Sequence, residues 1–486
     1  MLKVNNLKVN SNEKCILGGI SFSMKDGEIL GLVGESGSGK TITSLSIAGL
    51  LSNNLAMEGD VFLDNVELTK LSSRERREYN GSKIAFIFQE PMTSLNPLMK
   101  VGKQIEEVLK LHTDLDKKER YEKVLKIIEE VKLKNPQDLY EKYPYELSGG
   151  MRQRIVIAIA SVLQPSLIIA DEPTTALDAT TGRTILELIK ELNKKFGSKI
   201  LLISHDLNVI KQICENVIVM KNGYIVETGT TNEIFTKPKQ EYTKLLVEAV
   251  TKIEKENKVK GEKAIIAVEN LSLYYKEKKE TKIIAQNINF KMYEGEILGL
   301  LGESGCGKST LSRAITGLNT NYTGAIHKKC QNIQMVFQDP YASLNPSKNI
   351  GFILGEPLRY ATYLDENQKE CKYSKEQIEK RVYETLNEIG LPKEYYNRFP
   401  DELSGGQRQR ISIGTAIIAR PEIIVADEPV SALDVTVQKQ ILDLLLELQQ
   451  THRITMLMIS HDETVLNKVC DRIITWSQIC EEGNNT

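Results

Sequence analysis

The chain has 486 residues, of which 63 are basic and 65 acidic, and its formal net charge is −2. This balance is typical of globular domains and argues against a nucleic-acid-binding tail or a polybasic membrane anchor. The 7 cysteines are scattered and form no C-x-x-C pair, which favours a reducing cytosol over a disulfide framework or a zinc ribbon. No apolar signal region opens the chain and no apolar run reaches the ~18 residues of a spanning helix, so any membrane role would need a partner.

An apolar run predicts a strand at 29–33, and a helix is expected from Thr41 to Leu50. The loop between them reads GESGSGKT, which matches the phosphate-loop pattern G-x-x-x-x-G-K-[ST] in its required strand–loop–helix context. Its N–H groups and the helix N-terminus would surround phosphate oxygens. A glycine-rich turn without function is the alternative. The residues expected to contact nucleotide are Gly34, Glu35, Ser36, Gly37, Ser38, Gly39, Lys40 and Thr41.

Within this loop, Lys40 would reach the β- and γ-phosphates, and the Thr41 hydroxyl would bind Mg²⁺.

Further along, the segment between Gln89 and Leu147 has helical periodicity, for example over 121–131, and predicts an inserted helical subdomain.

A buried helix then runs into an apolar strand that ends in Asp171 and Glu172. Ligands of open parallel sheets lie beyond the carboxyl ends of the strands. We therefore expect Asp171 to bind Mg²⁺, and Glu172 to act as general base or to position the attacking water. The alternative is a buried strand whose terminal acids are merely solvated.

His205 follows the next apolar strand, at 201–204. A lone histidine is usually structural, but this one recurs at the equivalent position of a repeat described below. A hydrogen bond from His205 to the γ-phosphate or to the attacking water is the better interpretation. Ser204 and Asp206 do not make a hydrolase triad with it, because adjacent side chains of an extended chain point to opposite sides.

The motifs recur in the second half of the chain. GLVGESGSGKT at 31–41 returns as GLLGESGCGKS at 299–309, and ADEP and SHD return with an offset of 256 (427−171 and 461−205). This spacing indicates a duplicated domain. We predict a first domain at 1–250, a charged linker at 251–263 and a second domain at 264–486. Alternating strands and helices predict α/β domains, each with a mostly parallel core sheet and an inserted helical subdomain.

The second copy supplies an equivalent set of candidates. The phosphate loop would contain Gly302, Glu303, Ser304, Gly305, Cys306, Gly307, Lys308 and Ser309. Ser309 and Asp427 would bind Mg²⁺, Glu428 would serve as the base, and His461 would match His205.

One further repeated motif, Leu-Ser-Gly-Gly at 147–150 and 403–406, resembles the signature of ATP-binding-cassette transporters. A Ser-Gly-Gly turn at a helix N-terminus can bind anions. The resemblance covers nearly the whole chain and implies that its two halves pair head to tail around two ATP molecules. The signature residues expected to contact nucleotide are Ser148, Gly149, Gly150, Ser404, Gly405 and Gly406.

By the same resemblance, each signature completes the site of the opposite half. The first site would join Lys40 and its neighbours to Ser404, and the second would join Lys308 and its neighbours to Ser148. Asp178 and Asp434 match the D-loop that connects the two sites. Gln89 and Gln338 match the Q-loop, which contacts Mg²⁺ and water and reports to the membrane subunit.

The segments FQEPMTSLNP and FQDPYASLNP resemble the peptide and nickel importers of this family, in which two different ATPase subunits are common. This chain is similar to those two subunits fused. The resemblance implies two integral-membrane permease partners, an extracytoplasmic substrate-binding protein and a place on the cytoplasmic face of the membrane. No nucleic-acid partner is expected. A soluble tandem ATPase acting on ribosomes or DNA is the alternative, disfavoured by the short linker and the balanced charge.

The two halves differ in two places. Tyr275 could stack on adenine in the second half, whereas 7–11 offers no aromatic side chain in the first. Cys306 lies inside the second phosphate loop, where a helix N-terminus would lower its pKa; the alternative is a small residue that merely fills the loop. Neither half carries the cysteine-containing tail seen in many peptide importers, which leans the expected cargo towards nickel or metal chelates, with peptides close behind.

Overall fold

The computed structural model describes residues 1–11, 14–35, 37–175, 177, 179–250, 263–277, 280–303, 305–364, 370–431, 433 and 435–480. The chain divides into two units, Met1–Val250 and Thr251–Thr486. Some expected features lie outside the described residues: Ser36, Asp178, Ser304, Asp434 and nearly all of the linker at 251–263.

The first unit contains two sheets within its described residues. Its core sheet has the order β10-β9-β3-β8-β7-β6 and is parallel except for the pair β10–β9, and its second sheet, β2-β1-β4-β5, is antiparallel. The strands are β1 (Leu2–Asn10), β2 (Cys15–Met24), β3 (Ile29–Val33), β4 (Ala56–Leu63), β5 (Val66–Glu67), β6 (Ile84–Ile87), β7 (Leu167–Asp171), β8 (Lys199–Ser204), β9 (Asn216–Lys221) and β10 (Tyr224–Thr230).

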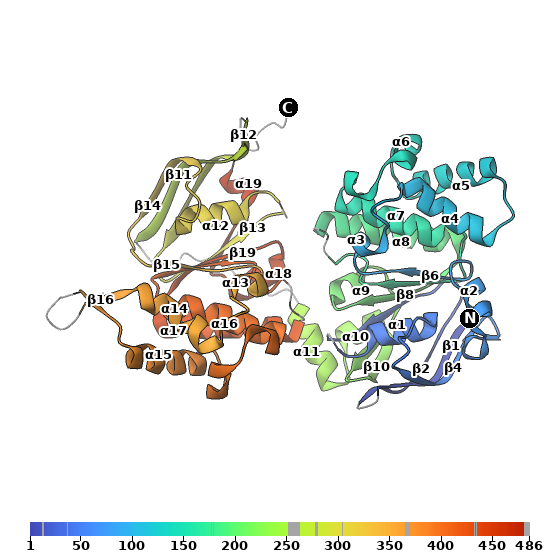
Figure 1. Ribbon diagram of the computed structural model, residues 1–486, viewed down its shortest axis with the longest axis horizontal. Helices are drawn as coiled ribbons and strands as arrows, with labels where there is room; N and C mark the ends of the chain where they lie inside the picture. The colour runs from blue at the N-terminus through green and yellow to red at the C-terminus, as the bar shows by residue number, and fades with distance from the viewer. Residues whose placement is uncertain are drawn as a thin grey trace. The chain divides into compact units, whose positions relative to one another are not determined.

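Helices cover both faces of this core sheet. They are α1 (Lys40–Ala48), η1 (Leu68–Lys70), α2 (Ser73–Tyr79), α3 (Pro91–Ser94), α4 (Val101–His112), α5 (Lys117–Glu130), α6 (Pro136–Glu141), η2 (Pro144–Glu146), α7 (Gly149–Ser161), α8 (Ala179–Phe196), α9 (Leu207–Ile213), α10 (Thr231–Thr236) and α11 (Glu241–Val250). Figure 1 shows α1 between the core sheet and the antiparallel sheet, with α4, α5 and α6 beyond α7 and α8 on the other side.

Alternation along β3 explains this layering. Leu30 and Leu32 are buried in one hydrophobic cluster with side chains of α1 and β1. Ile29 and Val33 point the other way, into a cluster with α7 and α8. A strand buried on both faces reads as a continuous apolar run, which is why the sequence made this strand easy to recognise.

The second unit repeats the plan within its described part. The core sheet β15-β18-β19-β13-β20 is parallel, β12-β11-β14 is antiparallel, and β16-β17 is a hairpin. The strands are β11 (Ala264–Glu277), β12 (Glu280–Tyr293), β13 (Ile297–Leu301), β14 (Tyr322–Lys328), β15 (Ile333–Val336), β16 (Thr362–Leu364), β17 (Glu370–Lys372), β18 (Ile423–Asp427), β19 (Thr455–Ser460) and β20 (Arg472–Thr475).

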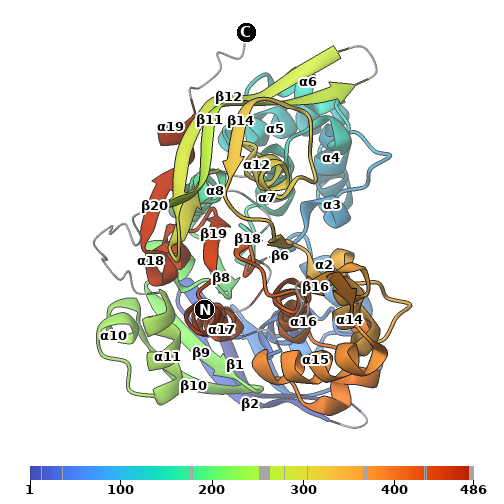
Figure 2. The same ribbon diagram turned by 90° about the vertical axis from the view of Figure 1, so that its left-hand side faces the viewer.

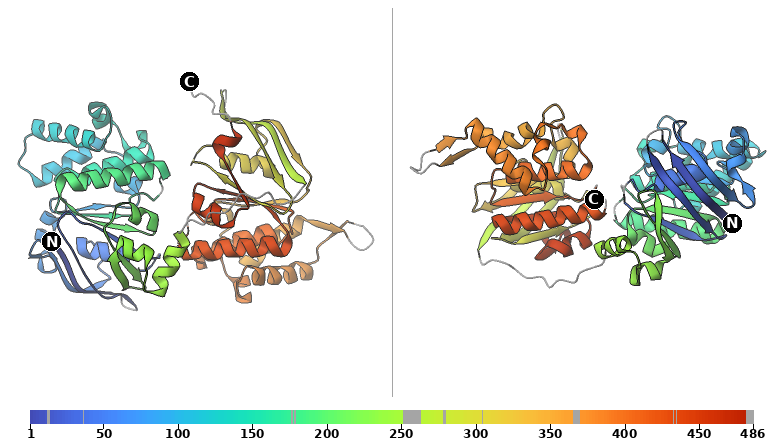
Figure 3. Two further views of the ribbon diagram at one scale, coloured as in Figure 1. Left: turned by 180° about the vertical axis from the view of Figure 1, so that it is seen from behind. Right: turned by 90° about the horizontal axis from the view of Figure 1, so that it is seen from below.

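The helices of the second unit take equivalent places. They are α12 (Lys308–Thr316), α13 (Pro340–Ser343), α14 (Ile350–Tyr360), α15 (Lys375–Glu388), η3 (Lys393–Asn397), η4 (Pro400–Glu402), α16 (Gly405–Ile417), α17 (Val435–His452), α18 (Glu463–Val469) and α19 (Trp476–Ile479). Figure 2 shows α12 against the strands β11 and β14. Figure 3, left, shows α15 and α17 in orange and red on the other side of the core sheet of this unit.

The expected α/β class, with a mostly parallel core sheet and a helical insertion in each unit, is confirmed. The helix after the first phosphate loop ends at Ala48, two residues earlier than expected. Gly49 adopts a left-handed φ of 68° as its C-cap, a conformation that glycine adopts without strain.

A buried carboxylate joins the helices of the first insertion. Glu106 of α4 is 7% exposed. It accepts hydrogen bonds from Lys103 Nζ at 2.7 Å, Tyr140 Oη at 2.6 Å and Arg120 Nε at 3.3 Å. Burial works to raise the pKa of Glu106, but the hydrogen bonds from Lys103 and Tyr140 outweigh it and lower that pKa to about 2.

Replacing Glu106 by glutamine is expected to destabilise the first unit by about 1–3 kcal/mol at pH 7, because charged donors lose their buried acceptor. The folded pKa of Glu106 lies below its ordinary value of 4.5. Its contribution is therefore present above pH 4.5 and is lost as the pH falls towards 2, so the difference between variant and parent should shrink in that window.

Urea denaturation followed by circular dichroism measures this effect. Trp476, the chain's 1 tryptophan, lies in the second unit and reports its unfolding separately by fluorescence. Glu107→Gln on the exposed side of the same helix is the control and should be near neutral. Equal losses for the two variants would contradict the role of the network.

Candidate functional site

Both phosphate loops follow a core strand and lead into a helix, as expected. The first runs from Gly34 to Gly39, between β3 and α1. Gly34 has φ 154°, and a Cβ there would lie 2.2 Å from the main-chain oxygen of Met220. Gly307 in the second loop has φ 114°, and its Cβ would lie 2.8 Å from Ile284. Only glycine fits these positions, because backbone and side chains approach so closely.

The loop lysines are buried and turn back on their own loops. Lys40 Nζ donates to the carbonyl oxygens of Gly34 at 2.7 Å and Glu35 at 2.8 Å. Lys308 Nζ donates to the carbonyl of Gly302 at 2.8 Å. Each ammonium group is therefore held at the mouth of its loop, where an anionic phosphate would be attracted to it.

Asp171 and Asp427 end equivalent core strands of the two units, β7 and β18, and both are almost fully buried. Burial raises the pKa of Asp171 to about 6, although a hydrogen bond from Thr41 opposes the rise. Burial also raises the pKa of Asp427, opposed by a bond from Ser309. A nearby cation would stabilise the ionised form of such a buried carboxylate and so lower its pKa again.

The oxygens around Asp427 fit such a cation. Its Oδ1 is buried and has no hydrogen-bond partner among the described atoms, while Oδ2 lies 3.3 Å from Ser312 Oγ. A carboxylate oxygen beside a hydroxyl suits Mg²⁺, which prefers oxygen ligands and usually completes its shell with water and substrate phosphates. Among the described residues, no cluster of three His, Cys, Asp or Glu side chains could hold a metal by itself.

The glutamate after each aspartate is held by groups from other strand ends. In the first unit, the carboxylate of Glu172 accepts from His205 Nδ1 at 2.8 Å, Gln89 Nε2 at 2.9 Å and Thr175 Oγ1 at 3.0 Å. Glu172 itself has a left-handed φ of 51°. This unusual conformation for a non-glycine residue turns the side chain off the strand direction and towards these donors.

The second unit repeats most of this arrangement. Glu428 has φ 47° and accepts from His461 Nδ1 at 3.1 Å and Gln338 Nε2 at 2.9 Å. Its third contact differs, because Ser431 Oγ donates at 3.2 Å to the main-chain oxygen of Glu428 rather than to the carboxylate. The two glutamates are thus fixed by related but unequal sets of bonds.

The contacts between each glutamate and its histidine shift the pKa values of both residues. Burial works to raise the pKa of Glu172 and of Glu428, but the bonds from the histidines outweigh it and lower both values. The bond to Glu172 raises the pKa of His205 against burial, and Glu428 does the same for His461. Each carboxylate is therefore ionised at neutral pH and can accept a proton from water.

Ser204 and Asp206 make other contacts than a triad would need. The Ser204 hydroxyl accepts from the main-chain N–H of Asp206 at 2.9 Å, and the Asp206 carboxylate caps α9 through Asn208 N. The histidine between them instead contacts Glu172, a partner that its place in the sequence did not indicate.

The signature serines begin helices on the surface. Ser148 caps α7 by accepting from Met151 N at 3.4 Å, and Ser404 caps α16 by accepting from Gln407 N at 3.4 Å. Both serines are exposed. Glycine is needed two positions on, because a Cβ at Gly150 would lie 2.6 Å from Thr181.

The predicted residues thus fall into separate groups. Hydrogen bonds gather Gln89, Glu172 and His205 in the first unit, and Gln338, Glu428 and His461 in the second. Tyr275 lies on β11 with its side chain 61% exposed, where a flat ligand could reach it.

The expectation of a low pKa for Cys306 is wrong. Its thiol is half-buried, and burial raises its pKa, outweighing the opposing effects of Lys308 and of the loop N–H groups. Burial disfavours the charged thiolate, and the sequence offered no measure of that burial.

Sequence reasoning also missed four contacting residues. Thr175 and Ser312 lie next to recognised motifs, so their motif position was an available signal. Tyr242 bonds to the first phosphate loop from α11, and Trp476 packs behind the second from α19. Both are remote from the loops in sequence, and no local pattern signals such contacts.

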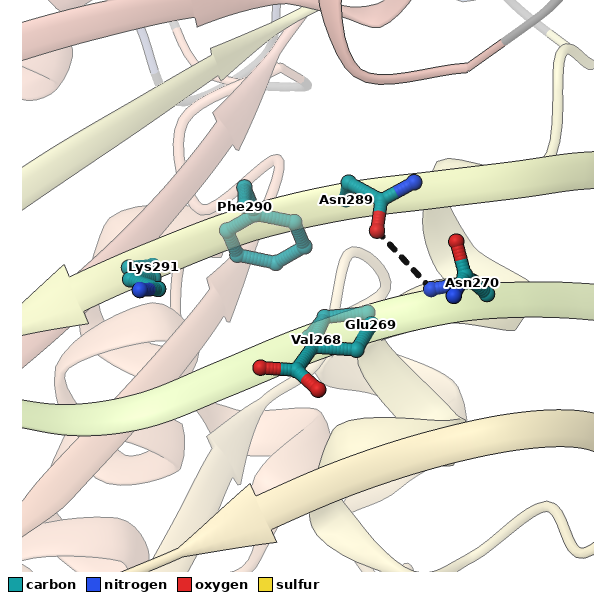
Figure 4. A pocket seen from close by; sticks show the side chains of 6 residues that line it. All are labelled: Val268, Glu269, Asn270, Asn289, Phe290 and Lys291. Atoms are coloured by element: carbon teal, nitrogen blue, oxygen red, sulfur yellow. Dashed lines mark hydrogen bonds between the residues drawn. The ribbon is translucent and has the colours of Figure 1, made fainter.

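Figure 4 shows a hollow elsewhere, on β11 and β12, where Asn289 Oδ1 accepts from the N–H of Asn270 at 2.9 Å. Its lining residues are Val268, Glu269, Asn270, Asn289, Phe290 and Lys291. None of them belongs to the repeated motifs.

Over the described part of the chain, no helix is both long and apolar enough to cross a membrane.

Comparison with known proteins identifies the family. The model of the ABC transporter family matches residues 17–175 and 285–431. The glutathione import ATP-binding protein GsiA of Escherichia coli O157:H7 is 38% identical over 523 residues, covering 96% of this chain and 82% of that protein. The peptidoglycan transport ATP-binding protein YejF of Agrobacterium fabrum is 38% identical over 489 residues, covering 96% and 88%.

Among solved structures, the ATP-binding cassette MJ0796 bound to ADP and Pi is 31% identical and covers 48% of this chain and 99% of its own, with a TM-score of 0.43. The family match covers most of both units, and the relatives extend along nearly the whole chain. The chain belongs to the ABC transporter family and is an ATPase of that family.

Proposed function

We propose that the chain is the energy-coupling subunit of an importer and that it hydrolyses ATP at two Mg²⁺-dependent sites. The observation that carries this proposal is the pair of glutamate clusters, around Glu172 and Glu428, each with its histidine and glutamine bonded in place. Relatives that match 96% of this chain are import and transport ATP-binding proteins. Neither cluster lacks a catalytic group, so both sites are active.

In each site, the phosphate loop binds the β- and γ-phosphates through its N–H groups and its lysine. Bound Mg²⁺ would neutralise phosphate charge, held by Thr41 and Asp171 in the first site and by Ser309 and Asp427 in the second. Gln89 and Gln338 lie beside the glutamates and contact the same water and ion shell.

Glu172 and Glu428 accept the proton of the attacking water. Their lowered pKa keeps them ionised for this role. His205 and His461 hold each carboxylate in place and face the γ-phosphate.

We place the signature of each unit in the site of the other. Ser404, Gly405 and Gly406 close the first site, and Ser148, Gly149 and Gly150 close the second. The exposed helix N-termini that carry both serines support this pairing, since they offer free N–H groups to a phosphate. Asp178 and Asp434 connect the two sites of the paired halves.

The partners follow from an importer's architecture. Two integral-membrane permease subunits carry the cargo and an extracytoplasmic protein delivers it, while this chain acts at the cytoplasmic face of the membrane. The cargo proposed is a short peptide or another peptide-containing compound, because the two relatives are named for glutathione import and peptidoglycan transport. Nickel or a metal chelate, favoured by the sequence, stays the second candidate. No feature supports the alternative of a ribosome- or DNA-acting ATPase.

Glu172→Gln and Glu428→Gln should each lower the rate of ATP hydrolysis at one site about a hundredfold or more, because a general base contributes about 10²- to 10⁴-fold. The double variant should retain ATP and accumulate in a closed, ATP-bound state. Steady-state phosphate release and retention of radiolabelled ATP measure the two effects. Glu187→Gln, an exposed glutamate of α8, is the control. Normal turnover in both single variants would show that the base has been misassigned.

Tyr275→Ala should weaken ATP binding in the second unit, because aromatic stacking on a base contributes ~1–3 kcal/mol, or about five- to 150-fold in affinity. Tyr275→Phe should bind ATP normally. Trp476 lies behind the second phosphate loop, so its fluorescence reports binding there. Tyr360→Ala, at another exposed tyrosine, is the control. Unchanged affinity in Tyr275→Ala would rule out stacking.

Deletion of the gene should impair growth on di- and oligopeptides and leave cellular nickel, cobalt and zinc unchanged. Growth assays and elemental analysis of the same cultures measure both outcomes, and complementation with the Glu172→Gln, Glu428→Gln double variant is the control. A fall in metal content with normal growth on peptides would support the metal cargo instead.

A further inference from the structure

A tyrosine far from the recognised motifs contacts the first phosphate loop. Tyr242 lies on α11 and is 7% exposed. Its hydroxyl oxygen accepts a hydrogen bond at 3.2 Å from the main-chain N–H of Glu35, a residue 207 positions away. Glu35 is the second residue of the GESGSGKT loop, so this bond connects α11 directly to the phosphate-binding backbone.

The bond completes the fixation of one peptide group. Its oxygen, that of Gly34, accepts from Lys40 Nζ at 2.7 Å, and its N–H, that of Glu35, donates to Tyr242. A peptide unit is planar, so holding both of its polar groups fixes the direction of the carbonyl that anchors the Lys40 ammonium. The Tyr242 hydroxyl therefore helps set the position of the lysine that meets the phosphates.

The tyrosine ring is itself held from several sides. Lys221 Nζ lies 4.4 Å from the ring centroid, a distance suited to a cation–π contact. Tyr242 and Leu246 belong to the same hydrophobic cluster as the side chains of α9, against which α11 packs. A side chain with this support can position its partner, because it has little freedom to follow a movement of the loop.

The second phosphate loop is supported differently. A Cβ at Gly302 would lie 3.0 Å from Trp476 Cβ, and a Cβ at Gly307 would lie 3.2 Å from the indole ring of the same residue. The loop of the second unit therefore rests against an aromatic side chain from α19. In the first unit, the equivalent Gly34 faces the main-chain oxygen of Met220.

We propose that Tyr242 is a positioning residue for ATP binding in the first site, acting through the Gly34–Glu35 peptide group on Lys40. This inference rests on the proposed function, since it assumes that the first loop binds ATP. Loss of the hydroxyl removes one of the hydrogen bonds that hold this peptide group, so the loop pays a larger ordering cost when ATP binds. The chemical groups around Glu172 are untouched, and the effect falls on binding rather than on hydrolysis.

The test is Tyr242→Phe, which removes the hydroxyl and keeps the ring. It is made in the full-length chain carrying Lys308→Ala, so that calorimetric titration with ATP reports the first site. The dissociation constant should rise about three- to tenfold, the size expected for one neutral hydrogen bond. In the chain with both lysines intact, KM should rise while kcat stays within about twofold and the unfolding temperature is unchanged.

Two matched controls accompany it. Tyr224→Phe removes the hydroxyl of an exposed tyrosine on β10 and should change neither constant. Tyr242→Phe combined with Lys40→Ala leaves the second site as the ATP-binding site, and affinity there should equal that of Lys40→Ala alone. An equal loss of affinity in that combination would show a general structural effect and overturn the proposal.

The outcomes separate this inference from the proposed function. If the Lys308→Ala parent binds no ATP, the proposed function of the first unit is wrong. If the parent binds ATP and Tyr242→Phe binds it equally well, only the role of Tyr242 is wrong. Should Tyr242→Phe fail to fold, amide exchange at Glu35 in the unaltered chain decides: slow exchange supports the bond and fast exchange contradicts it.

Discussion

The order of the parallel strands is the constraint on which both sites depend. In the first unit, Gln89 follows β6, Glu172 follows β7 and His205 follows β8, and these three strands are neighbours in the core sheet. β3, which leads into the phosphate loop, lies next to β8. Since parallel strands end at one edge of a sheet, groups that are far apart in the sequence meet there. The order β15-β18-β19-β13 repeats this arrangement in the second unit.

Duplication has kept that edge and changed what supports it. The carboxylate of Glu172 accepts from Thr175 in the first unit, whereas Ser431 donates to the main-chain oxygen of Glu428 in the second. The phosphate loops rest on Tyr242 in one case and on Trp476 in the other. Apart from Tyr275, the groups that would touch ATP are nearly the same, so the other differences between the sites arise in the residues that hold those groups in place.

The sequence predicted the parts that depend on local pattern. Apolar runs and glycine spacing located β3, β7 and both phosphate loops, and the repeat located the second copy of each. It did not predict the bond of His205 to Glu172, because that bond depends on the left-handed φ of Glu172 and on the order of β7 and β8. The pKa of Cys306 was wrong for a similar reason, since burial depends on tertiary packing and outweighs the helix N-terminus.

The support by α11 links the two ends of the first site. α11 packs against α9, and α9 begins directly after His205, with Asp206 as its N-cap. The same helix bonds the phosphate loop through Tyr242. One helix thus contacts both the loop that binds the phosphates and the segment that carries the histidine. Because packed helices resist small displacements, a movement of the loop relative to β8 must also move α11. The last helix of the first unit is therefore part of the nucleotide site, although it carries none of the family's motifs.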